Sequence, residues 1–326
     1  MSVSYLQKRN LRNLGFQSSQ ILILRQKRDS SYIQTFDKKN DFEVYTNWTS
    51  TRFSFLPLHG RKSDFSLLTN SSVHTGFNLN YKWASIGYGV SVPATARDEA
   101  AKKMQQYAFQ LGSNSAKMGW TAYVQWYKNF LTPQTHRSYV KISSVHYTGI
   151  GSSFYFITNS KKFSYSAAKS YSQLQRKSSG TFLLSLSPTY NAFTHKGDGF
   201  DNEAASVMKE SDFLLKDPRW LSLIGGVAYM HNIVWQDGRW NVSPLIHIGY
   251  GRLHEFSSSK WQPATEWKSS LTVGYNSQTW YSYLSCFYHA ENSYLKEKKI
   301  AEQNNGISLT AGYRLGNLKN KIAGIL

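Results

Sequence analysis

Residues 73–93 read VHTGFNLNYKWASIGYGVSVP, and apolar and polar side chains alternate along the whole stretch. The apolar positions are Phe77, Leu79, Tyr81, Trp83, Ile86, Tyr88, Val90 and Val92. A period of two indicates a β-strand with one apolar face and one polar face. The apolar residues occupy odd positions up to Trp83 and even positions from Ile86. We therefore predict two strands that are joined by a turn or bulge between these two residues.

The same alternation recurs from Asp41 to Gly316, in segments that polar turns separate. The clearest turn is Gln-Asp-Gly-Arg at residues 236–239, because an Asp-Gly pair tolerates the positive φ of a tight hairpin. We distinguish about thirteen segments, most of them near the ~9–11 residues that cross a bilayer when tilted. Bacterial single-chain barrels close on an even number of strands. The prediction is therefore an all-β fold, a transmembrane antiparallel up-and-down β-barrel of about 12 strands within a range of about 10–14.

The alternation also sets the predicted domain organisation. We expect an irregular N-terminal arm over residues 1–40, a single β-barrel domain over residues 41–316 and a C-terminal extension over residues 317–326. A long loop within the barrel domain should carry one short helix, because residues 201–216 are rich in helix formers and Asp201 can cap their start. Two soluble sandwich domains are the alternative, and they would require a linker where this helix-bearing loop lies.

The width of the barrel decides which face of each strand points outward. About twelve strands enclose a lumen too wide for a dry core, so the polar faces should line the lumen and the apolar faces should meet lipid. The polar faces consist mostly of Gly, Ser, Thr and Asn, and the lumen-facing candidates are Lys82, His247 and Arg314. Aromatic residues near strand ends fit the interfacial girdles of such barrels. The interfacial candidates are Trp83, Trp120, Trp240, Trp267 and Trp280.

Composition supports a membrane location and sets the expected partners. Aromatic residues make up 15% of the chain, and Tyr and Trp favour sites that are apolar at one end and wet at the other. The formal net charge is +19, but Lys and Arg are scattered near segment ends, which argues against a nucleic-acid stripe. The expected partners are membrane lipid and, beyond it, lipopolysaccharide or anionic solutes. A solvated basic surface without a specific partner is the alternative.

No motif for catalysis, metal or cofactor binding is recognisable. The chain contains no P-loop, GxGxxG, HExxH or CxxC motif, and we predict a protein that is not an enzyme and has no cofactor. The one hint of a hydrolase is Ser243 with His247, which share a face of one predicted strand. We favour hydrated lumen side chains as the explanation of that pair. Asp198, Asp201 and Glu203 lack the ligand spacing of an EF-hand loop and are interpreted as a solvated acidic loop.

Three stretches resemble a known family. Residues 161–187, KKFSYSAAKSYSQLQRKSSGTFLLSLS, look like the central signature of an uncharacterised family of outer-membrane β-barrel proteins typical of Bacteroidota. Residues 75–93 resemble the glycine-rich hairpin of that family, and Ser-Tyr-Ile at residues 31–33 resembles its start. The resemblance implies an exported outer-membrane barrel, and it implies no activity and no site residues.

These observations lead to a ranked expectation of function. The first reading is a passive pore or solute-binding barrel in the outer membrane, with a polar and weakly cationic lumen. The alternative is a structural or interaction barrel with a filled lumen whose loops bind partners or lipid headgroups, and an outer-membrane lipid hydrolase is less favoured. No secretory signal peptide is visible in this chain, since the apolar run at residues 21–24 is short and ends at Arg25.

Overall fold

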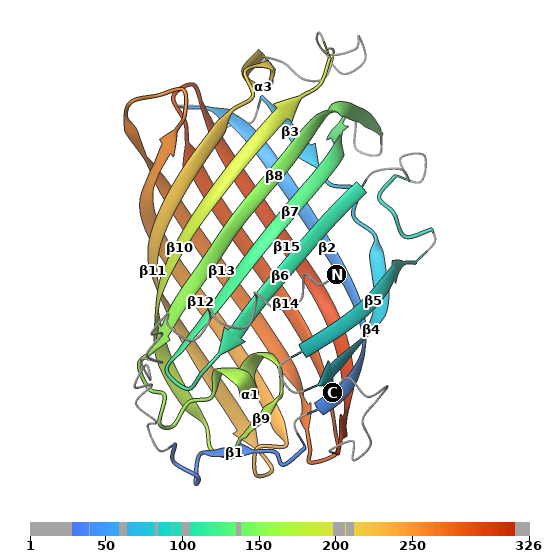
Figure 1. The fold of residues 1–326 in the computed structure, drawn as a ribbon, viewed down its shortest axis with the longest axis vertical. Coiled ribbons are helices and arrows are strands. Elements are labelled where there is room, and N and C mark those ends of the chain that lie inside the picture. The colour runs from blue at the N-terminus through green and yellow to red at the C-terminus, as the bar shows by residue number, and fades with distance from the viewer. Residues whose placement is uncertain are drawn as a thin grey trace, which may run out of the picture.

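The computed structural model describes residues 28–38, 40–58, 64–81, 84–92, 94–98, 105–134, 138–197, 206 and 212–316. These residues form strands and two short helices (Figure 1). The strands are β1 (Ile33–Thr35), β2 (Asn40–Pro57), β3 (Phe65–Leu68), β4 (Val73–Tyr81), β5 (Ala84–Ser91), β6 (Gln105–Asn114), β7 (Met118–Pro133), β8 (Tyr139–Ile157), β9 (Gln173–Gln175), β10 (Ser179–His195), β11 (Arg219–Trp235), β12 (Trp240–Glu255), β13 (Trp261–Asn276), β14 (Trp280–Tyr294) and β15 (Lys298–Leu315). The helices are α1 (Tyr165–Lys169) and α3 (Asp212–Leu215).

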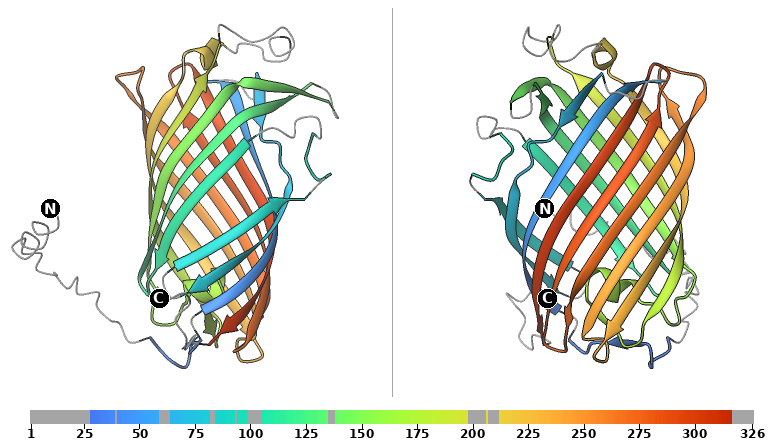
Figure 2. Two further views of the ribbon diagram at one scale, coloured as in Figure 1. Left: turned by 45° about the vertical axis from the view of Figure 1, so that its right-hand side comes forward. Right: turned by 180° about the vertical axis from the view of Figure 1, so that it is seen from behind.

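The large sheet has 13 strands and closes on itself as an antiparallel barrel. Its closed circuit runs β15-β14-β13-β12-β11-β10-β8-β7-β3-β2, and β2 pairs with β15 along nearly its full length. Figure 2 shows the strands tilted around the barrel on both sides. The predicted antiparallel β-barrel is confirmed: ten strands form the closed circuit, within the predicted range of about 10–14, and β4, β5 and β6 are further strands of the same sheet. The hairpin predicted at residues 236–239 is also confirmed, because Trp235 pairs with Trp240 across a turn in which Gly238 has a φ of +86°.

The wall is less regular near its N-terminal strands. β3 and β4 pair with β2 one after the other, so they occupy a single position in the wall. β3 meets β7 through the pair Leu68 and Leu131, which closes the circuit near the end that carries α3. Towards the other end, β5 pairs with β4 and β6 pairs with β7. Within the residues that the structure describes, no ladder joins β5 to β6.

The barrel is apolar outside and polar inside. On β10, the outward side chains Phe182, Leu184 and Leu186 are about half exposed, whereas the inward side chains Thr181 and Ser187 are buried. A soluble barrel would have the reverse arrangement, and an outward apolar band is the pattern of a barrel that lipid surrounds. In the described part of the chain, no helix is long and apolar enough to cross a membrane.

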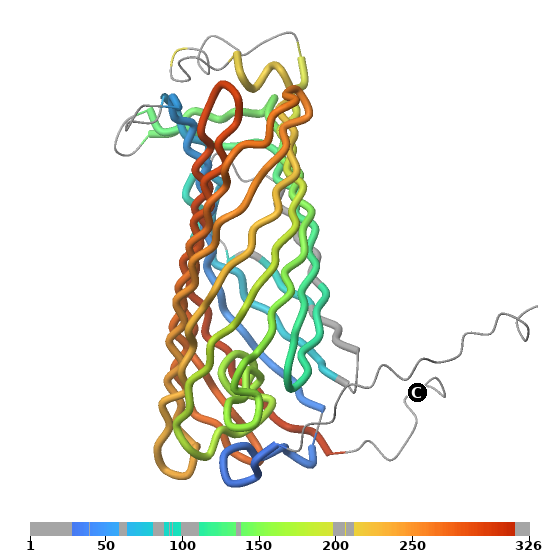
Figure 3. The backbone as a smooth tube through the Cα atoms, turned by 90° about the vertical axis from the view of Figure 1, so that its left-hand side faces the viewer, coloured from blue at the N-terminus to red at the C-terminus, as the bar shows by residue number. Residues whose placement is uncertain are grey.

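At the α1 end, the chain folds back into the barrel as a plug, which we define as residues 158–178. Asn232 Nδ2 of β11 donates to the carbonyl of Ser164 (3.0 Å), and Asn241 Nδ2 of β12 donates to the carbonyl of Ala167 (3.2 Å). Lys169 Nζ donates to Ser270 Oγ of β13 (2.6 Å). Figure 3 shows the α1 segment at the lower end of the barrel. The wall strands therefore hold this plug through their inward side chains.

The plug differs from what its sequence pattern indicates. Phe163, Tyr165 and Ala167 alternate with polar residues as in a strand, but Tyr165–Lys169 is helix α1, because Ser164 Oγ accepts the amide of Ala167 as an N-cap. The short polar–apolar alternation there matched a strand by coincidence. The expected arm of residues 1–40 also contains β1, which pairs with β9 of the plug. The helix expected at residues 201–216 is observed as α3 where the structure describes that loop.

At the α3 end, apolar side chains fill the lumen. This α3-end core contains inward residues from seven or more wall strands and two residues of α3. Its aromatic members are Phe53, Phe55, Phe65, Tyr127, Phe130, Tyr147, Phe193, Phe213 and Trp220. Phe53 is 1% exposed, and its ring centroid lies 4.7 Å from that of Tyr147 and 5.2 Å from that of Phe193. The barrel is thus packed at both ends, by a polar plug and by an aromatic core.

Candidate functional site

A row of three carboxylates crosses the lumen wall between the plug and the α3-end core. Glu266 of β13 pairs with Glu291 of β14, and Glu291 pairs with Glu302 of β15. Directly paired residues on adjacent strands share a face, so all three side chains point into the lumen. Like charges at such positions repel, and burial raises the cost further. A barrel wall would not accumulate this arrangement for stability alone.

A second row, one step nearer the plug, carries nitrogen-bearing side chains. His247, Lys268, His289 and Asn304 are consecutive partners across β12 to β15. Lys268 Nζ donates to Glu266 Oε1 (2.7 Å), and His289 Nε2 lies 3.0 Å from the same oxygen. Two cationic or proton-donating groups therefore hold Glu266 as a carboxylate, with its side chain 4% exposed.

His247 connects these rows to β10. Its Nδ1 atom lies 3.5 Å from Glu266 Oε2, and its Nε2 atom lies 2.8 Å from Ser185 Oγ. β11 runs between β10 and β12, and Gly226 is its residue at this level. A Cβ atom at Gly226 would lie 2.3 Å from His247 Nε2, so any other residue there would push the imidazole away from Ser185. The glycine allows side chains from two non-adjacent strands to meet.

Two adjoining cavities lie beside these side chains. One has a volume of about 240 Å³ and is lined by the three carboxylates, and the other has about 290 Å³ and reaches the plug at Lys169. Lys268 and His289 border both cavities. Together the cavities form a polar chamber between the two packed ends of the barrel. The chamber is large enough for a small solute.

Among the described residues, one group could hold a metal ion, because oxygen or nitrogen atoms of Glu266, His289 and Glu291 lie within 4.8 Å of one another. Carboxylate and imidazole ligands suit several divalent cations. However, the ammonium of Lys268 already occupies Glu266 Oε1. The lysine therefore already supplies positive charge where a metal ion would bind, and a cation would have to use the other oxygen, Oε2.

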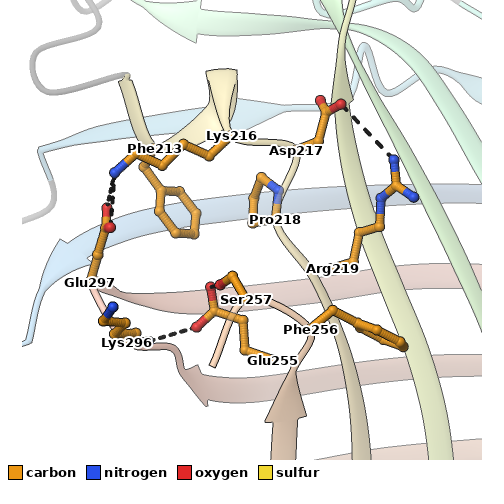
Figure 4. A pocket seen from close by; sticks show the side chains of 10 residues that line it. All are labelled: Phe213, Lys216, Asp217, Pro218, Arg219, Glu255, Phe256, Ser257, Lys296 and Glu297. Atoms are coloured by element: carbon orange, nitrogen blue, oxygen red, sulfur yellow. Dashed lines mark hydrogen bonds and ion pairs between the residues drawn. The ribbon is translucent and has the colours of Figure 1, made fainter. Parts of the chain in front are cut away.

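A further pocket of about 290 Å³ lies at the rim of the α3 end, between α3 and the β14–β15 hairpin (Figure 4). Lys216 Nζ contacts Glu297 Oε1 (2.8 Å), and the amide of Lys296 donates to Glu255 Oε2 (2.8 Å). The first contact ties the loop after α3 to the hairpin, and the second ties the hairpin to the end of β12. The charged groups satisfy one another, so the pocket is interpreted as part of the rim structure.

The structure describes two of the three predicted lumen residues, and they lie in different parts of the barrel. His247 lies beside Glu266 on the lumen wall, whereas Arg314 of β15 lies against the plug and is 2% exposed. Its Nη2 atom donates to Tyr171 O (2.5 Å) and Asn276 Oδ1 (2.7 Å), so it is a structural anchor. Lys82 lies outside the described residues. The expectation of a weakly cationic lumen contrasts with the carboxylate row that lines the chamber.

The predicted interfacial tryptophans are also spread over different positions. Trp240 and Trp280 lie at the α1 end, where each packs on the ring of Tyr275. Trp120 is exposed on β7, near its start. Trp83 lies outside the described residues. Trp267 does not lie at a strand end: β13 begins at Trp261, so this side chain is exposed in the middle of the outer face.

Sequence reasoning missed Ser185 and Glu266 and chose the wrong serine as the partner of His247. Ser243 Oγ donates to Asn232 Oδ1 (2.7 Å) and is not the hydroxyl that contacts the imidazole. The partner is on another strand, 62 residues away in the chain. The one signal in the sequence was that Ser185, His247 and Glu266 occupy strand positions that face the lumen, as many other residues do.

The architecture defines a class: a closed antiparallel barrel with an apolar exterior and a packed, partly charged interior. The chain belongs to the family described as "Domain of unknown function (DUF4421)", whose model matches residues 27–315. The expected membership of an uncharacterised family is thereby confirmed. A search of curated protein sequences gives no match.

Several solved barrels are similar in shape. The β domain of the Bordetella autotransporter BrkA has a TM-score of 0.40 and 10% identity, covering 82% of this chain and 98% of that one. The outer membrane protease OmpT from Escherichia coli has a TM-score of 0.35 and 7% identity, covering 86% and 98%. An outer membrane channel from Pseudomonas putida F1 has a TM-score of 0.31 and 9% identity, covering 86% and 97%.

Proposed function

We propose that this protein is an outer-membrane barrel with a closed lumen, which acts through its rims and its internal chamber and does not serve as an open pore. The observation that carries this proposal is the packing of both ends. The plug at the α1 end contains side chains that are fully buried, such as Phe163 and Ala168, and the α3-end core is equally buried. This favours the interaction barrel over the passive pore, the two alternatives that the sequence allowed.

Planar-bilayer recording tests the closed lumen directly. We expect purified, folded protein to give no steady conductance at moderate voltage, because protein atoms fill both ends of the path. Heat-modifiable gel migration of the same sample is the control that folded barrels are present. Reproducible long-lived open channels from such a sample would contradict the proposal and restore the passive pore.

The rim at the α1 end supports a partner of negative charge. Four exposed basic side chains of the plug gather there, joined by one from the neighbouring turn. They are Lys161, Lys162, Arg176, Lys177 and Arg239. The turn packs on the plug, since a Cβ atom at Gly238 would lie 2.0 Å from the carbonyl oxygen of Gln175. Phosphate-bearing lipid headgroups fit this rim, because each basic residue near an anionic surface contributes about 1 kcal/mol.

A charge reversal tests this partner. We expect a short-chain phosphatidylglycerol to raise the melting temperature of the protein in neutral detergent, and the double variant Lys161→Glu/Arg176→Glu to lose at least about half of that rise. Added salt should weaken the effect, since exposed charges are screened. Lys260→Glu, an exposed lysine at the α3 end, is the matched control. Equal loss in the control variant would show non-specific charge binding and remove the rim from the proposal.

The internal chamber is the second candidate for function. Its volume and its charged lining suit a small polar solute. The carboxylate row favours a cationic solute over the anionic one that the sequence suggested.

A further inference from the structure

Ser185, His247 and Glu266 form a continuous row across the inner wall. The imidazole of His247 lies between the other two, with Nε2 at 2.8 Å from the hydroxyl and Nδ1 at 3.5 Å from the carboxylate. With a proton on Nδ1, the ring points that proton at Glu266, and Nε2 is free to accept the hydroxyl proton of Ser185. The contact with Ser185 is the one that a nucleophile makes with its base, and Glu266 lies where an orienting acid would lie, just beyond hydrogen-bond distance from Nδ1.

Two members of this row are buried and yet have polar atoms without hydrogen-bond partners, which is unusual for side chains with a purely structural role. The side chains of His247 and Glu266 are 5% and 4% exposed. His247 Nδ1 and Glu266 Oε2 are both buried without a hydrogen-bond partner among the described residues, and they face each other. Buried polar atoms are ordinarily satisfied, so a pair held just beyond bonding distance is costly. The pair would tighten when the imidazole becomes positively charged.

Neighbouring residues of the wall hold Glu266 in place and leave room for His247 to reach Ser185. Lys268 and His289 hold the other oxygen of Glu266, which fixes the carboxylate from behind. Gly226 leaves the space in which the imidazole reaches Ser185. Ser185 itself is only partly buried. A reactive hydroxyl needs this combination of an anchored base and an open approach.

We propose that Ser185 is a nucleophile that His247 activates for the hydrolysis of small carboxylic esters. The Ser185 oxygen would bond to the ester carbon while its proton passes to His247 Nε2 and then to the departing alkoxide. Water would next attack the acyl-serine, with His247 taking its proton and returning one to Ser185. Ester and water thereby give acid and alcohol. Glu266 is a positioning residue.

One side of the otherwise polar chamber is apolar and suits an acyl group. Phe287 shares the inward parity of His289 and Glu291, yet its side chain is 38% exposed. It borders the larger cavity with Leu245. Lys268 and His289 border the same cavity and contact Glu266 of the row, so an apolar ring on this part of the lumen wall suits a short acyl chain. The absent β5–β6 ladder in the described residues leaves the wall least tightly joined there, which favours entry from the lipid side.

The experiment is covalent labelling of the full-length folded protein with diisopropyl fluorophosphate, in which the serine oxygen displaces fluoride from phosphorus. Peptide mass mapping should locate the adduct on Ser185. Ser185→Ala should abolish it, and His247→Gln should slow it by about 100-fold or more, the usual contribution of a general base. Ser243→Ala is the matched control and should label at the wild-type rate, because its hydroxyl contacts Asn232 and Asn241.

Access is separated from reactivity by repeating the labelling in an Arg314→Ala background, which loosens the plug. An adduct on Ser185 in either background supports the proposal. It is overturned if neither heat-modifiable sample carries an adduct on Ser185, or if His247→Gln labels as fast as the parent. Hydrolysis of p-nitrophenyl butyrate should follow the same order among the variants. The conductance test of the closed lumen has an independent outcome.

Discussion

Arg314→Ala should release the plug from the α1 end of the barrel. The guanidinium of Arg314 donates to the carbonyls of Tyr171 and Ser277 and to Asn276 Oδ1 (2.7 Å). It also lies 3.7 Å from the ring centroid of Phe36. A buried acceptor that loses its donor costs about 1–3 kcal/mol, so the free energy of unfolding should fall by roughly 2–5 kcal/mol. Much of this loss should appear as local opening of the plug.

Hydrogen exchange followed by mass spectrometry measures that opening. Amides of residues 163–175 should exchange at least about tenfold faster in the variant, while β12 and β13 remain protected, because the wall ladders do not depend on the plug. Arg252→Ala is the matched control, since this arginine is exposed on β12. If the plug exchanges at the same rate in Arg314→Ala and in the wild type, the arginine is not its anchor.

The barrel fold could be predicted from the sequence because the patterns that specify its strands and turns are local. Alternation with a period of two follows from strand geometry, and the Asp-Gly pair specifies a tight turn wherever it occurs. The outward face could be assigned because Phe182, Leu184 and Leu186 have no plausible place in a wide wet lumen. Family resemblance and pattern agreed on this point.

The packing of the lumen could not be predicted from the sequence, because it depends on which strands face one another across the lumen. Trp220 looks like a girdle residue in the sequence, but it packs at the α3 end and is 3% exposed. The plug contains alternating residues such as Phe163 and Tyr165 that imitate a strand, and its position follows from contacts with β11, β12 and β13. A lumen expected to be wet at both ends is therefore packed at both.

The contact between Ser185 and His247 illustrates the same limit. Its existence requires the order β10-β11-β12, the register that places Gly226 between them, and a residue without a side chain at that position. Each of the three conditions is set by pairing that spans tens of residues. Local patterns specify the face of a strand and leave its register open.

Phe53→Ala should destabilise the barrel more than any comparable change on its outer face. The Phe53 ring packs in the α3-end core against Tyr147, Phe193, Phe130 and Tyr127. Truncating a fully buried phenylalanine costs about 3–5 kcal/mol through lost contacts and the cavity left behind. Urea unfolding in detergent, followed by heat-modifiable migration, should show the midpoint falling accordingly. The fall should be far smaller for the matched control Phe154→Ala, whose side chain is 43% exposed on the outer face.

The same core also closes the lumen, so its loss has a second consequence. Combining Phe53→Ala with Arg314→Ala removes one packing residue from each end and should produce conductance that neither single variant gives. Because Glu266, Glu291 and Glu302 line the path between the ends, this conductance should prefer cations, as rings of carboxylates do in channels. Replacing Glu291 by Gln in the double variant should reduce that preference. An anion-selective current would show that the path bypasses the carboxylate row, and a silent double variant would show that the two ends are closed by more than these contacts.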